Sequence, residues 1–252
     1  MMGRTHALAG VVMTLALQPL FTPLGMPDTT TGTCLAVVGA AGGAMLPDLD
    51  HRHATVARSL GPVSKAVTVV VAAISGGHRN GTHSILGVVV FTALSWWLVG
   101  LGGWPATLWA AFVLAIGSAA LHIRFRKSSA VAHTLMCLAG VVWLIDSGRT
   151  ATFPWQALTW GVGVGAFSHA IVPTDALTRQ GCPWLWPVSR KRFRLANLST
   201  DHFMENGPVW WSLCAGLTWL VLLRAGVTWV DVVSSVESWR HTGRDLRAAF
   251  TR

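Results

Sequence analysis

The sequence is short of charge. Only 12% of its 252 residues are Asp, Glu, Lys or Arg, whereas a typical soluble domain carries about 25%. Hydrophobic residues make up 52%, so the balance favours a membrane protein over a soluble one. In a soluble chain the net charge of +9 would suggest a nucleic-acid partner. Here the basic residues are divided among short loops between apolar segments, as in cytoplasmic loops of membrane proteins, and we expect no nucleic-acid partner.

Cysteine pairs and several familiar catalytic motifs are also absent. The four cysteines are far apart and form no C-x-x-C, which excludes a disulfide framework and a thiolate zinc site. Tyrosine is absent, whereas many of the 14 tryptophans lie at the ends of apolar segments, as interfacial anchors do. Serine-hydrolase elbows, Walker loops, dinucleotide fingerprints and HExxH do not occur.

The apolar segments indicate an all-α fold, a polytopic transmembrane helix bundle. They fall at 7–21, 33–47, 66–75, 85–101, 105–122, 130–146, 154–172 and 209–223. Spanning a bilayer takes about 17–25 residues, so 66–75 is too short, and we expect it to form a half-membrane or re-entrant segment. The segments at 85–101, 105–122, 130–146 and 154–172 are long enough to span. We expect a multi-pass membrane domain over 1–225 and an amphipathic basic tail over 226–252.

The positions of Lys and Arg predict the topology. Three basic clusters lie near 52–65, 124–127 and 179–194, and all three fall in the cytoplasm if 66–75 does not cross. The opposite loops then carry a single Arg149, in agreement with the positive-inside rule. We therefore expect a multi-pass membrane protein with its candidate site residues at the cytoplasmic face.

Two polar clusters interrupt the apolar pattern. Leu46–His51 offers the carboxylates of Asp48 and Asp50 and the imidazole of His51, which are oxygen and nitrogen ligands for a divalent metal. Gly76–Ser84 adds His78 and His83 as ligands, and Arg79 as a group that binds anions by bidentate hydrogen bonds. The alternative is a solvated helix end followed by a loop whose Thr82 or Ser84 caps the next helix.

A third cluster lies at the end of segment 154–172. His169 sits inside the apolar segment, where an imidazole without a partner is unfavourable, and Asp175 follows shortly. The basic run beyond it, which includes Arg190 and Arg192, either attracts anionic headgroups or a phosphorylated substrate, or is a plain cytoplasmic loop. His122 and His133 are expected to be interfacial, and Asp201, His202 and Glu205 to form a solvated loop helix.

Together these segments resemble the YdjM-like family of inner-membrane, metal-dependent hydrolases, also described as LexA-binding. The resemblance rests on Thr5-His6, LPDLDH at 46–51, GHRNGTHS at 77–84, and Ser168-His169 with DALT at 175–178. It implies a membrane-bound metal site. The family pattern places an acid four residues after the histidine, whereas His169 and Asp175 are six apart with Pro173 between them. Either Asp175 returns to the site by a loop, or it does not belong to it.

The leading hypothesis is a hydrolase that uses a metal-activated water at the cytoplasmic membrane interface. One or two divalent ions, zinc or manganese or magnesium, would be bound by a subset of eight residues: His6, Asp48, Asp50, His51, His78, His83, His169 and Asp175. The expected catalytic residues are Asp48 or Asp50 as general base and Arg79 as stabiliser of an anionic transition state. The substrate would be a phosphoester or lipid-linked compound held by Arg79, Ser84, Arg190 and Arg192.

Two other classes of function stay open. The first is a non-enzymatic membrane adaptor that binds a cytosolic protein through its basic loops and holds a structural metal in a closed shell. The second is a transporter with an ion path of acids and histidines. The transporter ranks last, because the polar residues lie at helix ends and not deep within several helices.

Overall fold

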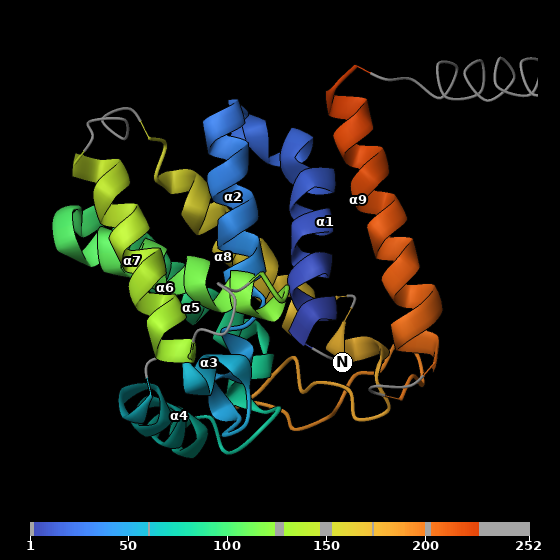
Figure 1. Cartoon of the computed structure of the whole chain (residues 1–252). Coiled ribbons are helices and arrows are strands. Elements are labelled where there is room, and N and C mark those ends of the chain that lie inside the picture. Colours follow the sequence, from blue (N-terminus) through green and yellow to red (C-terminus); the bar gives the residue numbers. More distant parts are fainter. Residues whose placement is uncertain are drawn as a thin grey trace, which may run out of the picture. The chain divides into compact units, whose positions relative to one another are not determined.

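The computed structural model describes residues 3–59, 61–123, 129–146, 153–172, 174–199 and 203–226. Within these ranges the regular structure is helical, and two isolated β-bridges join loop segments. The helices are α1 Gly3–Phe21, α2 Thr30–Gly43, α3 Thr55–Arg58, α4 Pro62–Ile74, α5 Ile85–Leu101, α6 Gly103–Ala120, α7 Ala130–Asp146, α8 Gln156–Ala170 and α9 Trp210–Arg224 (Figure 1). The predicted all-α class is confirmed. Met1–Leu213 form one compact unit, which we describe by itself. Residues 227–252 of the predicted tail lie outside the described residues.

Each of the eight predicted apolar segments forms a helix, but their lengths differ from expectation. Four stretches among the described residues are long and apolar enough to cross a membrane: Gly3–Leu24, Thr30–Asp50, Gly103–Ala120 and Glu205–Arg224. By contrast α5 and α7 have 17 residues and α8 has 15. Helix α8 ends earlier than predicted because the chain after Ala170 turns back on the helix, where the Thr174 amide donates to the Ser168 carbonyl over 3.1 Å.

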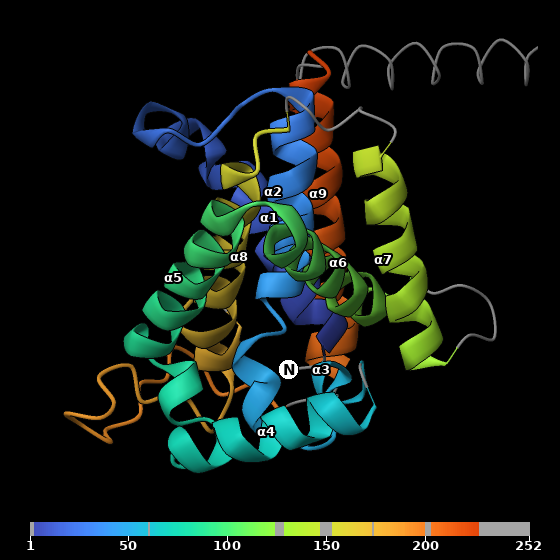
Figure 2. The same ribbon diagram turned by 90° about the vertical axis from the view of Figure 1, so that its left-hand side faces the viewer.

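Helix α2 lies at the centre of the helices of this unit and contacts α1, α6 and α8 (Figures 1 and 2). Its small residues allow backbones to touch. A Cβ added at Gly39 would lie 2.3 Å from the Leu158 carbonyl oxygen, and one at Gly161 would lie 2.0 Å from that of Ala36. In a bilayer the hydrophobic effect does not drive helices together, and helices associate through close packing of small residues. The α2–α8 pair therefore brings the end of α2 beside the end of α8.

Helix α4 lies crosswise to α5 and α8 at one end of the helices (Figure 2). Its 13 residues span about 20 Å, which is too short to cross a bilayer, as predicted for segment 66–75. The helix buries polar Ser64 and Thr68 and exposes Val63, Val67 and Val70. A helix with an outward apolar face is typical of the membrane interface. This agrees with the expectation that the segment does not cross the membrane.

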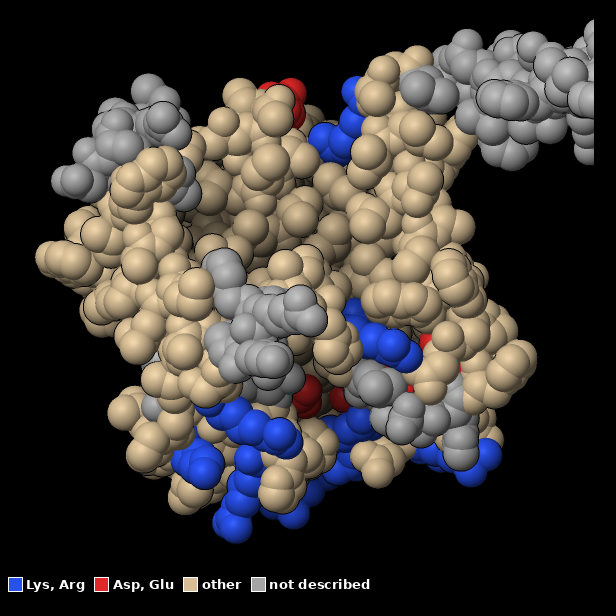
Figure 3. All heavy atoms as spheres, viewed as in Figure 1, with Lys and Arg blue, Asp and Glu red and all other residues tan. Residues whose placement is uncertain are grey.

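Basic residues gather at the end of the molecule where α3 and α4 lie (Figures 1 and 3). Arg52, Arg58 and Lys65 line one hollow beside α4, and all three are exposed. The basic loop predicted at 124–127 lies outside the described residues. This concentration of positive charge at one end agrees with the topology expected from the sequence.

Candidate metal centre

Three parts of the chain meet at the basic end: the 3-10 turn Pro47–Asp50 after α2, the loop Gly76–Ser84 before α5, and the end of α8 with the turn Asp175–Leu177. The loop is fixed at its α5 end. The Ser84 hydroxyl accepts from the Gly87 amide over 3.2 Å and donates to the Gly81 carbonyl over 2.6 Å. The predicted cap by Ser84 is therefore confirmed. The same hydroxyl, which we had also expected to bind substrate, is used as both donor and acceptor within the loop.

The centre of the cluster is one oxygen of Asp175. Its Oδ2 lies 3.4 Å from His83 Nε2 and 3.5 Å from His169 Nε2. Asp48 Oδ1 lies 3.8 and 3.7 Å from the same two nitrogens. Ligand atoms 2.0–2.2 Å from a tetrahedral zinc ion are about 3.3–3.6 Å apart. The nitrogen–oxygen spacings around Asp175 are those of a metal site.

The second ring nitrogen, Nδ1, of both His83 and His169 is also engaged, and this orients the two imidazoles. His169 Nδ1 donates to the backbone carbonyl of Ala44. His83 Nδ1 lies 3.0 Å from Thr82 Oγ1, whose own hydrogen goes to Asp50 Oδ2 over 2.6 Å, so the hydroxyl accepts from the imidazole. Both Nε2 atoms are buried and form no hydrogen bond with the described part of the chain. Histidine metal ligands are held in this way, with the second nitrogen donating to a carbonyl or other acceptor.

Asp50 organises the cluster from behind His83. Its carboxylate accepts from the Arg79 amide over 3.0 Å, from Thr82 Oγ1 over 2.6 Å and from His78 Nδ1 over 2.7 Å. Both oxygens are therefore engaged by donors of the loop before α5. Asp50 was expected to be a metal ligand or general base. In the structure its carboxylate instead accepts hydrogen bonds from Thr82, which orients His83, and from Arg79 and His78 of the same loop.

The electrostatics of the cluster link His83 to Asp175. Burial alone would raise the pKa of the Asp175 carboxyl, but the charges of His6 and His169 hold this pKa well below its usual range. Burial alone would lower the pKa of His83, but the nearby carboxylates of Asp175 and Asp50, 3.4 and 3.5 Å from its ring nitrogens, outweigh it and raise the pKa to about 9. Without a metal, a proton on His83 thus offsets the charge of Asp175.

Arg79 fixes the other oxygen of Asp175. Its guanidinium donates to Asp175 Oδ1 over 3.0 Å and to Thr178 Oγ1 over 2.7 Å. The side chain is buried, and the backbone has a φ of 60°, a conformation rare for a residue with a Cβ. These contacts hold Arg79 as a support for Asp175. We had expected it to face the substrate.

His6 completes the inner side of the cluster. Its ring stacks on His169 with centroids 3.7 Å apart, and its Nε2 lies 3.4 Å from Asp175 Oδ1. His6 Nδ1 lies 2.7 Å from Thr174 Oγ1, which itself donates to the Ser168 carbonyl over 2.8 Å. Thr174 thereby ties the segment before Asp175 to α8. This turn answers the question of the six-residue spacing, because it returns Asp175 to His169.

Two groups of side chains are spaced to hold a metal ion: His6 with His169 and Asp175, and Asp48 with His78 and His83. The contacts of Asp175 Oδ2 with both His83 and His169 join the two groups into one site. The structure thus brings together six of the eight predicted ligands directly, and Asp50 through hydrogen bonds. Among the described groups His51 belongs to neither, although its ring lies 4.6 Å from that of His78.

The remaining predicted residues lie farther from Asp175. Arg190 and Arg192 are exposed, and Arg192 reaches the loop before α5 through a 3.4 Å contact with Asn80 Oδ1. His133 is buried and contacts Ser118 Oγ over 2.9 Å. Glu205 was expected in a solvated loop helix, but its side chain is buried, and Asp201 and His202 lie outside the described residues.

Sequence reasoning missed two supports. Thr82 had been considered as a helix cap only, and Thr174 had not been assigned a role. Their direct adjacency to His83 and Asp175 was the available signal.

Comparison with known proteins identifies the family. The family model described as YdjM inner membrane protein matches residues 1–125 and 128–233. Searches of curated proteins and of solved structures gave no match. The matched ranges contain all the residues of the cluster, and four helices are long enough to cross a membrane. The chain therefore belongs to the YdjM inner membrane protein family, as its sequence resemblance predicted, and is a multi-pass protein of the inner membrane.

Proposed function

We propose that the protein is a metal-dependent hydrolase whose site lies at the cytoplasmic surface of the membrane. One observation carries the proposal: two buried imidazole nitrogens, His83 Nε2 and His169 Nε2, face the same oxygen of Asp175. Two nitrogens and one carboxylate oxygen suit zinc, with an open fourth position as in catalytic zinc sites. When bound, such an ion lowers the pKa of a water molecule to near neutrality and so makes hydroxide available.

The contacts of Asp175 support a single metal ion. Its Oδ2 faces the two imidazoles, while its Oδ1 accepts a hydrogen bond from the Arg79 guanidinium over 3.0 Å. A second cation on Oδ1 would lie beside a guanidinium that stays protonated in proteins. We therefore assign Arg79 the role of holding Asp175 in place, and His6 the role of packing against His169.

Asp48 is the candidate general base. It lies slightly farther from both imidazoles than Asp175 does, at 3.7–3.8 Å. Its side chain is 22% exposed, whereas those of His83, His169 and Asp175 are at most 1% exposed. Solvent and substrate therefore approach beside Asp48, where its carboxylate can accept the proton of the attacking water.

The proposed substrate is a phosphoester, including a lipid-linked one. Arg192 contacts Asn80 in the loop that carries His78 and His83, so a basic segment borders the site. Arginine binds phosphate oxygens through paired hydrogen bonds. The crosswise helix α4 and the exposed cations around it indicate that this end of the protein meets anionic headgroups.

Three variants test the assignment. His83→Ala and His169→Ala should each lose zinc from the purified protein and lose phosphodiester hydrolysis. Asp48→Asn should retain zinc but lose hydrolysis by about 10²–10⁴-fold, the usual contribution of a general base. His133→Ala is the matched control, since His133 is a buried histidine that contacts Ser118.

Retention of full zinc content by His83→Ala would contradict the metal assignment. Zinc bound by the wild type without hydrolysis of any phosphoester or lipid probe would instead favour the structural metal of a membrane adaptor.

A further inference from the structure

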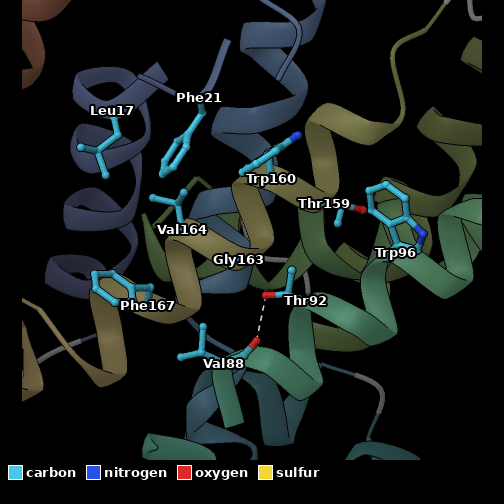
Figure 4. A pocket seen from close by; sticks show the side chains of 10 residues that line it. All are labelled: Leu17, Phe21, Val88, Thr92, Trp96, Thr159, Trp160, Gly163, Val164 and Phe167. Carbon is cyan, nitrogen blue, oxygen red and sulfur yellow. Dashed lines mark hydrogen bonds between the residues drawn. The ribbon is translucent and has the colours of Figure 1, made fainter. Parts of the chain in front are cut away.

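An apolar groove runs along the outside of α1, α5 and α8 (Figure 4). Its volume is about 590 Å³. The lining side chains are almost entirely apolar, and they are Leu17 and Phe21 of α1, Val88, Thr92 and Trp96 of α5, and Thr159, Trp160, Val164 and Phe167 of α8, with Gly163 between them. In Figure 4 these residues face a common hollow between the three helices.

The hydroxyls of the two threonines in the groove both have hydrogen-bond partners within the protein. Thr92 Oγ1 donates to the Val88 carbonyl of its own helix over 2.8 Å, and Thr159 Oγ1 pairs with Ser95 Oγ over 3.1 Å. Gly163 leaves the space between α5 and α8 open, because an added Cβ there would lie 3.0 Å from Thr92 Oγ1. Besides these hydroxyls, the only polar side-chain groups among the lining residues are the indole N–H groups of Trp96 and Trp160, so a hydrocarbon chain would mainly contact carbon.

One end of the groove is level with the metal centre along the axes of α5 and α8. Val88 is one helical turn from Ser84, and Phe167 is two residues before His169. From Val88 to Trp96 the helix rises about 12 Å, which gives a groove long enough for the first carbons of an alkyl chain. Because α1, α5 and α8 form its walls, the groove runs along these helices and away from the cluster.

The two environments together fit an amphiphile. The groove is uncharged, while the end with the metal cluster carries the exposed cations Arg52, Arg58 and Lys65. A molecule with an anionic head at the cytoplasmic surface and a hydrocarbon tail in the bilayer would meet both. A tail that packs into a fixed groove places the head relative to His83 and His169, which is the usual way in which remote binding orients a reacting group.

We propose that this groove binds the hydrocarbon chain of the substrate and so positions an anionic ester at the metal centre. The inference rests on the proposed hydrolytic function and adds to it a chain-binding subsite formed by Val88, Thr92 and Val164. The chain lies in the groove with its first carbons at Val88 and Phe167.

A paired substitution on α5 tests the groove. Val88→Trp fills the end nearest the cluster, and Val90→Trp adds the same side chain at a position that is exposed and does not line the groove. The probes are methyl, octyl and hexadecyl p-nitrophenyl phosphate, which water cleaves to the alkyl phosphate and p-nitrophenol. Assays use the zinc-loaded protein in detergent micelles.

The wild type should show a KM for the octyl and hexadecyl probes about tenfold below that for the methyl probe, as a pocket that recognises alkyl groups does. Val88→Trp should lose this difference while its zinc content stays unchanged. Val90→Trp should behave as the wild type. Equal KM values for all chain lengths in the wild type, or equal effects of the two variants, would overturn the proposal.

A binding measurement separates the groove from the chemistry. A hexadecyl phosphonate with a diazirine near its phosphonate end should crosslink to the α5 and α8 segments that line the groove, and Val88→Trp should reduce the yield severalfold. This result is expected even if no probe is hydrolysed, in which case only the proposed hydrolase activity fails. Crosslinking spread evenly over the lipid-facing helices would indicate ordinary bilayer contact and contradict the groove.

Discussion

At the residue scale, the carboxylate of Asp175 divides its two oxygens between different tasks. Oδ2 faces the imidazoles of His83 and His169, and Oδ1 is held by Arg79. A buried carboxylate is unfavourable without compensating partners, and here the partners come from segments more than 90 residues earlier as well as from the adjacent helix. The position of the proposed ion is therefore defined by contacts that the fold must complete first.

Zinc binding should depend on pH through His83. The pKa of His83 is raised to about 9 in the metal-free protein, so below that pH a proton must leave before Nε2 can bind a metal. Zinc affinity should therefore rise with pH up to about 9 and level off above it, with close to one proton released per ion at pH 7. Calorimetry in two buffers of different ionisation enthalpy measures this proton. Release of no proton would contradict the assignment of His83 as a ligand.

Arg79 should matter for metal affinity even though it is not a ligand. Arg79→Lys keeps the charge but cannot place two donors on Asp175 and Thr178, since lysine lacks the planar fork. We expect zinc affinity to fall about 10–100-fold, as for other residues that orient ligands. Competition with a chelator gives the affinity. Arg192→Lys, an exposed change near the same loop, should leave it unaltered.

At the scale of elements, the contact between α2 and α8 is the framework of the site. Gly161 lies where the backbones of the two helices touch. Near their ends, the carbonyl of Ala44, which follows α2, accepts a hydrogen bond from His169 in the last turn of α8. A change of spacing at the glycines would move the Ala44 carbonyl away from the imidazole that it orients.

Gly161→Ala should destabilise the protein. The added Cβ would lie 2.0 Å from the Ala36 carbonyl oxygen, and overpacking of this kind costs about 1–3 kcal/mol. Thermal unfolding in detergent should show a lower midpoint, together with weaker zinc binding. Gly140→Ala on α7 is the control, because no atom lies within 4 Å of its added Cβ. It should be neutral or stabilise the helix by about 0.5–1 kcal/mol. Equal midpoints for both variants would contradict the close-contact interpretation.

Helices were easier to predict than the closure of the site. Hydrophobic runs fixed eight segments, because burial in lipid requires long apolar helices with internally satisfied backbones. The ligand clusters were also visible, since polar groups at helix ends in an apolar chain are rare. The sequence could not show which of these side chains faces the proposed ion and which holds another ligand in place. Asp48 and Asp50 are two residues apart and chemically identical. Only the folded loop places Asp50 behind His83 and leaves Asp48 partly exposed.

The same limit applied to Asp175. The six-residue separation from His169 suggested that Asp175 lies away from the site, because Pro173 prevents the helix from continuing to a ligand one turn later. The hydrogen bonds of Thr174 to α8, which return the carboxylate, depend on a loop conformation that periodicity does not encode.

At the scale of the whole molecule, the orientation in the membrane is testable. Single cysteines in a cysteine-free background report the side of each loop. Lys65→Cys and Arg190→Cys should react with an impermeant maleimide only in inverted vesicles, and Asp28→Cys, in the predicted outer loop 22–32, should react in intact cells. All three positions are exposed. Labelling of Lys65→Cys and Arg190→Cys from opposite sides would mean that an odd number of the helices between them cross the membrane, which would contradict the predicted topology.

The convergence of three distant chain segments on Asp175 also has a consequence for biosynthesis. The ribosome makes His6, Asp48 and His83 early, but the carboxylate that completes the cluster belongs to residue 175 of 252. During insertion, the nascent chain therefore exposes isolated histidines without a competent binding pocket. If the cluster binds the proposed ion, loading would follow the insertion of α8, and a chain released before residue 175 would have most of its helices but would lack the carboxylate that completes the site.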